Sequence, residues 1–92
     1  MSDDKTADAI NDGKRAHLLL NDELLNKAFA ALERDYIGFW KITPARDTDA
    51  RERLWHGVQA VGKLRDHLVA VMNNGKLAQA DLEAREDTKA VW

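Results

Sequence analysis

An apolar stripe with helical spacing lies in the first half of the chain and constrains the fold more than any other feature. Its members follow one another at steps of four, three, four and three residues: Leu25, Phe29, Leu32, Tyr36 and Phe39. That spacing matches one face of an α-helix, which completes a turn in about 3.6 residues. Asn21 is a suitable N-cap, and Pro44 disfavours helical backbone in the residue before it. The stripe therefore predicts a helix over about residues 22–41.

A second helical stripe follows the polar segment TPARDTD at residues 43–49. Asp47 or Thr48 can cap its start, and NNG at residues 73–75 is typical of a C-cap with a left-handed glycine, Gly75. Two long helices with a short polar connection predict an antiparallel hairpin. The two stripes supply the expected core: Leu25, Phe29, Leu32, Phe39, Leu54, Val58, Val61 and Leu68.

The remaining segments complete the expected domain organisation. A chain of 92 residues allows one domain at most. We expect a flexible acidic N-terminus over residues 1–12, a hairpin domain over 13–76, and a short helix or disordered acidic tail over 77–92. The segment ending in HLLL predicts a shorter N-terminal helix, which Gly13 weakens. The fold class is all-α, completed by self-association because a two-helix hairpin needs further apolar cover.

Aromatic residues concentrate around the polar turn. Four of the six lie between Asp35 and Gly57. In an antiparallel pair they meet near the closed end, as a buried hydrophobic plug or as an exposed patch for a partner. The candidate interaction tip contains these aromatic residues and neighbouring cations: Tyr36, Trp40, Arg46, Arg51 and Trp55.

The residues that enzymes and metal sites need are missing or scattered. There is no cysteine, Ser2 is the only serine, and the five glycines form no phosphate-binding loop. His56 and His67 are eleven residues apart, roughly 16 Å along a helix, so they cannot share one metal ion. We therefore expect no enzyme, and no catalytic, cofactor or metal site.

Charge and hydropathy narrow the classes of partner. Near the turn, arginines alternate with acidic residues along the sequence: Arg46, Asp47, Asp49, Arg51, Glu52 and Arg53. The acidic residues offset most of the positive potential, which disfavours a nucleic-acid site. No run approaches the roughly 20 apolar residues of a membrane-spanning helix. The acidic MSDDKTADAINDGK is no secretory signal, so we expect a cytoplasmic protein without membrane partners, or a component of a virion.

Four features between residues 15 and 78 occur in combination: LLNDELLNKAF at 19–29, the pair Tyr36 and Trp40, RDTDARERLW at 46–55, and NGKLA at 74–78. In this combination, about two thirds of the chain resembles small helical proteins encoded in tailed-phage and prophage genomes. The resemblance implies a viral role, in the virion or in DNA packaging. It carries over no site residues.

The first functional hypothesis is a non-enzymatic assembly protein that binds copies of itself, with a phage structural or packaging role. The partner is then a second copy, or another phage or host protein. A small inhibitor that binds a host protein through its acidic ends or its aromatic tip is the first alternative. A nucleic-acid-binding subunit of DNA packaging is the second.

Overall fold

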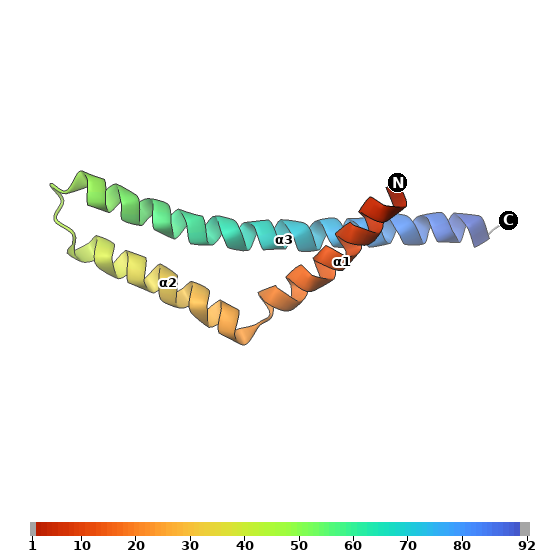
Figure 1. Cartoon of the computed structure of the whole chain (residues 1–92), viewed down its shortest axis with the longest axis horizontal. Helices are drawn as coiled ribbons and strands as arrows, with labels where there is room; N and C mark the ends of the chain where they lie inside the picture. Colours follow the sequence, from red (N-terminus) through yellow and green to blue (C-terminus); the bar gives the residue numbers. More distant parts are fainter. Residues whose placement is uncertain (1, 91–92) are drawn as a thin grey trace. The chain divides into compact units, whose positions relative to one another are not determined.

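The structure, a computed structural model, describes the backbone of residues 2–90 and the side chains of residues 4–86. The described backbone forms three helices and no strand: α1 (Ser2–Leu20), α2 (Glu23–Ile42) and α3 (Thr48–Ala90) (Figure 1). The predicted all-α class is confirmed. Residues 1, 91 and 92, which belong to the two expected tails, lie outside the described residues.

Local side-chain contacts set both ends of α2. Its N-cap is Asp22, one residue after the expected Asn21: the Leu25 amide donates to Asp22 Oδ1 over 2.7 Å. At the other end, the Thr43 amide and hydroxyl both donate to the Phe39 carbonyl, over 3.1 and 2.6 Å. Pro44 follows directly. These contacts satisfy backbone groups that a helix end leaves unpaired.

The start of α3 agrees with its local sequence, but its end does not. The Ala50 amide donates to Asp47 Oδ1 over 3.2 Å, so Asp47 is the cap. The prediction that Gly75 ends this helix is wrong, because α3 continues for 43 residues to Ala90. No described residue has a positive φ, so Gly75 keeps ordinary helical backbone. The residues after it, LAQADLEAR, are mostly strong helix formers and continue the helix.

The N-terminal segment is also more helical than expected. Helix α1 spans 19 residues and covers most of the segment 1–12 for which a flexible terminus was expected. Alanines favour helix there, and Asp4 lies in the first turn, where a negative charge interacts favourably with the helix dipole. Residues 77–90 likewise continue α3 and do not form a separate short helix or tail.

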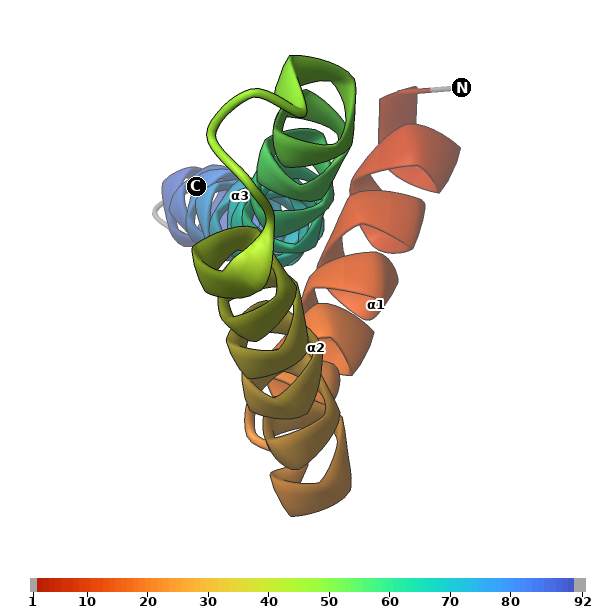
Figure 2. The ribbon, with the colours of Figure 1, turned by 90° about the vertical axis from the view of Figure 1, so that its left-hand side faces the viewer.

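The chain divides into two compact units, where length alone predicted one domain. The central unit is Asn21–Asp66, and contains α2 with the first part of α3. In it the two helices lie side by side, joined by residues 43–47 (Figures 1 and 2). The terminal unit pairs α1 with the second part of α3, residues 67–90.

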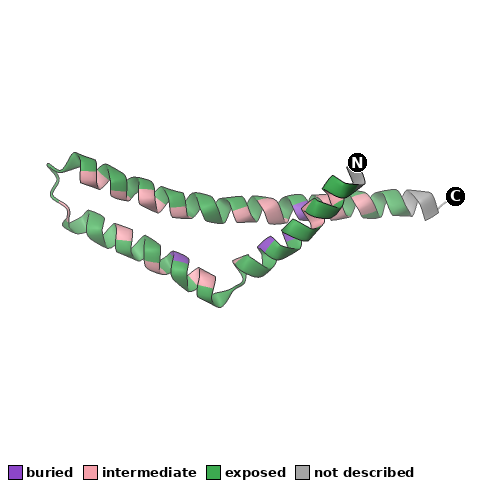
Figure 3. Cartoon of the chain, in the orientation of Figure 1, coloured by how far each residue is buried: buried purple, intermediate pink, exposed green. Residues whose placement is uncertain are grey.

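Burial is sparse in both units (Figure 3). In the central unit Phe29 is buried, and four expected core residues are half-buried: Leu25, Leu54, Val58 and Val61. Leu68 is half-buried in the terminal unit. Contrary to expectation, Leu32 and Phe39 are exposed, at 46% and 57%. They belong to an apolar face of α2 that is wider than the strip one neighbouring helix can cover.

Candidate interaction surfaces

Arg51 joins the end of α2 to the start of α3 in the candidate tip. Its Nη1 donates to the carbonyls of Thr43 and Trp40, over 2.9 and 3.2 Å. Its guanidinium carbon lies 4.1 Å from the centroid of the Trp40 ring, within cation–π range. Two of the five predicted tip residues are therefore in direct contact. Arg51 serves there as a cap for α2, which commits its charge to the protein itself.

Tyr36 packs against a helical glycine. A Cβ atom placed on Gly57 would lie 2.9 Å from Cε1 of Tyr36, so the ring occupies the space that a larger residue would need. Tyr36 is half-buried as a result. Gly57 thus admits a side chain of α2, whereas Gly62 faces open space, since a Cβ placed there would meet nothing within 4 Å.

The tryptophans of the tip are accessible. Trp40 is 40% exposed and Trp55 is 54% exposed, so the rings do not form the closed plug that was one of the two interpretations. Arg46 is exposed in the connection. The tip is a partly open aromatic surface, fixed on one side by Arg51 and Tyr36. Its role as an interaction site stays a prediction.

The terminal unit is built on a close contact between two glycines. A Cβ on Gly13 would lie 2.8 Å from Cα of Gly75, and a Cβ on Gly75 would lie 2.7 Å from Cα of Gly13 and 2.8 Å from the Ala9 carbonyl oxygen. Both glycines are buried. The backbones of α1 and α3 touch here, which is possible only because neither residue has a side chain.

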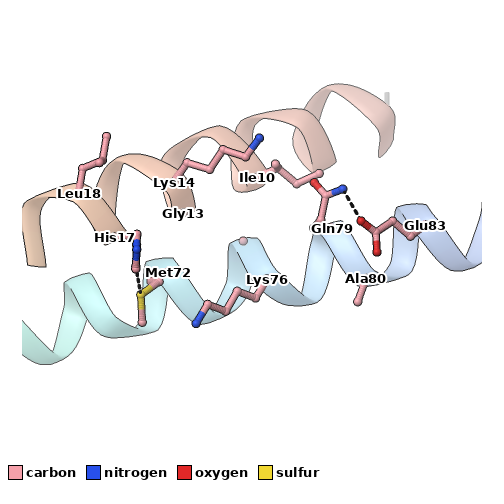
Figure 4. A pocket seen from close by; sticks show the side chains of 11 residues that line it. Ile10, Gly13, Lys14, His17, Leu18, Met72, Lys76, Gln79, Ala80 and Glu83 are labelled. Carbon is pink, nitrogen blue, oxygen red and sulfur yellow. Dashed lines mark hydrogen bonds between the residues drawn. The ribbon is translucent and has the colours of Figure 1, made fainter. Parts of the chain in front are cut away.

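Beside this contact, α1 and α3 enclose an open groove of about 620 Å³ (Figure 4). Its apolar lining comes from both helices: Ile10, Leu18, Met72 and Ala80. His17 Nδ1 lies 3.4 Å from the Met72 sulfur. A second hollow of about 510 Å³ shares Ile10, Lys14 and Gln79 with the first, so the groove continues toward Glu86.

Charge is unevenly distributed along this groove. Lys14 on α1 and Lys76 on α3 line its middle, and no acidic side chain among the described residues lies within salt-bridge distance of either. Glu83 and Glu86 line the part toward the end of α3, together with Arg85. Gln79 Nε2 donates to Glu83 Oε1 over 3.0 Å and leaves the other carboxylate oxygen available.

Sequence reasoning missed this groove. The sequence feature that indicates it is a set of small residues on one face of α1, spaced at steps of four and three: Ala9, Gly13 and Ala16. Gly13 was interpreted as weakening a helix, and Gly75 as ending one. Both interpretations considered each glycine alone, whereas the two act as a pair.

Three further observations concern metal clusters, membrane-spanning helices and similarity to known proteins. In the part that the structure describes, no three residues of the metal-binding types cluster together. Within the same part, no helix combines the length and the apolar character needed to cross a membrane. No protein-family model matches the chain, and no curated protein or solved structure matches it.

Proposed function

We propose that the protein is a non-enzymatic helical assembly protein, a hairpin of long helices that binds further copies of itself. The observation that carries the proposal is the shortage of buried apolar side chains. Among the described residues, Ala16 and Phe29 are the buried apolar ones. The large apolar residues that remain exposed are far more numerous: Leu18, Leu19, Leu24, Leu32, Ile37, Phe39, Trp40, Ile42, Trp55, Leu64, Val69 and Leu77.

The exposed apolar residues are numerous enough to form an interface. Each unit packs one pair of helix segments, so the apolar faces of its helices have no second neighbour within the unit. A standard protein interface buries about 800 Å² on each partner. Covering these apolar residues with a second copy would supply the apolar burial that the single chain lacks.

The viral setting of the proposal rests on the resemblance of residues 15–78 to small phage and prophage proteins. A structural role in the virion, or a role in packaging, suits a chain whose surfaces favour binding over chemistry. Nucleic-acid binding has less support, because Arg51 is committed to the end of α2. Arg46 and Arg53 remain interleaved with acidic residues.

A second candidate function is a small inhibitor of a host protein. The observation that favours it is the exposure of Trp40 and Trp55 beside an ordered turn, since tryptophan is a frequent anchor of protein interfaces. In this case the chain would stay a monomer, and the tip would bind the host protein.

Unfolding at several protein concentrations tests the proposal. A self-associating protein gains stability by mass action, so its urea midpoint should rise steadily as the concentration is raised from low micromolar upward. A midpoint independent of concentration would contradict self-association and favour the small inhibitor.

A further inference from the structure

The groove of the terminal unit combines apolar lining with two cations that no described acidic side chain pairs. Ile10, Leu18 and Met72 would gain from apolar cover. Lys14 and Lys76 are exposed there and would interact favourably with carboxylates or other anions on the occupant. The occupant that this surface selects is therefore a helix with small or apolar residues and acidic side chains at helical spacing.

The chain itself offers such a surface. On α3, Lys76 and Glu83 are seven residues apart and line the same groove, so they lie on one face about 10 Å from each other. Ala80 lies between them, lines the groove and is exposed. Its small side chain leaves room for another helix to approach at that point.

This arrangement is complementary to itself. If two copies of α3 meet in antiparallel orientation about an axis near Ala80, Lys76 of each copy comes opposite Glu83 of the other. A two-fold contact of this kind repeats the same pair of residues twice. Parallel pairing would instead place like charges together, which is destabilising.

We infer that two copies of the chain pair through this groove, antiparallel, with the two-fold axis between Gln79 and Ala80 and Lys76 opposite Glu83 of the second copy. The inference rests on the self-association proposed above, and specifies the surface and the residues that make it. Met72, one helical turn before Lys76, also lines the groove and extends the contact with an apolar side chain.

The pairing is tested with charge-reversal variants, studied alone and mixed with one another. Sedimentation velocity measures the dissociation constant, and circular dichroism checks that each variant is folded. Lys76→Glu and Glu83→Lys should each raise the dissociation constant by about 10-fold or more, because each puts two like charges together twice. An equimolar mixture of the two variants should restore pairing as a heterodimer. The double variant K76E/E83K should pair with itself, at a dissociation constant within about threefold of the original.

A matched control is Lys63→Glu, an exposed reversal on α3 in the central unit, which should leave the dissociation constant unchanged. If the original chain associates but the single reversals have no effect, or mixing restores nothing, the inference is overturned and self-association stands. If the original chain is a monomer at every concentration, both fail. If the chain is a monomer that binds dodecanoate, and Lys76→Glu abolishes that binding, the occupant of the groove is an anionic amphiphile and not a second copy.

Discussion

Gly13 and Gly75 decide how α1 and α3 pack. Their α-carbons meet with no side chain between them, and both residues are buried. In most helix interiors a glycine is a cost of about 1 kcal/mol relative to alanine. Here the same replacement places a methyl group against backbone of the other helix, which can make room only if the two helices shift. Whether replacing a glycine with alanine raises or lowers the free energy of unfolding therefore depends on what the new Cβ atom would contact.

Four alanine substitutions separate these two effects. Gly13→Ala and Gly75→Ala should each destabilise the protein by about 1–3 kcal/mol, because overpacking outweighs the gain in helix propensity. Gly38→Ala and Gly62→Ala, whose Cβ would meet nothing within 4 Å, should stabilise it by up to about 1 kcal/mol. Urea unfolding followed by circular dichroism measures all four. Equal effects at the four positions would contradict the close glycine contact.

The two phenylalanines of α2 make a second matched pair. Phe29 is 7% exposed and Phe39 is 57% exposed. Phe29→Ala should cost about 3 kcal/mol or more, since it removes a buried ring and leaves a cavity. Phe39→Ala should cost less than about 1 kcal/mol at a concentration where the chain is monomeric. Urea unfolding measures both, and a loss below about 1 kcal/mol for Phe29 would refute its place in the core.

At the scale of the element, Arg51 links α2 to α3. Arg51→Met keeps the aliphatic stem but removes the donors to the Trp40 and Thr43 carbonyls and the charge above the Trp40 ring. The expected loss is about 1–2 kcal/mol in urea unfolding. Arg53→Met, exposed on the same helix, is the control and should have little effect. A similar loss for both would show that the cap contributes nothing measurable.

The sequence predicted, to within one residue, those helix ends that nearby residues determine. Asp22 and Thr43 bond to backbone within four residues of themselves, and Pro44 stands next to the end of α2. The end of α3 was missed because the partner of Gly75 is Gly13, from the other end of the chain. Arg51 and Trp40 were both expected at the tip, although their contact was not. The groove depends on how α1 and α3 pack, and the small residues on one face of α1 indicate only that another helix can approach there, not which one.

At the scale of the whole molecule, the structure has little core for its length. Each unit packs one pair of helix segments, and a helix with a single neighbour leaves part of its apolar face uncovered. Leu32 and Phe39 in the central unit and Leu18 in the terminal unit are such uncovered residues. We interpret them as surface that a second copy covers, which extends the hydrophobic burial of a chain too short to complete its own core.

The proposed self-association is tested most directly by the molar mass in solution, measured by light scattering on a size-exclusion column at micromolar concentration. We expect the mass of a closed oligomer, with twice the 10.4 kDa of the chain as the simplest case. A sharp peak at the mass of one chain, unchanged as the concentration is raised, would contradict the account. The exposed apolar residues would then have to be assigned to a different partner.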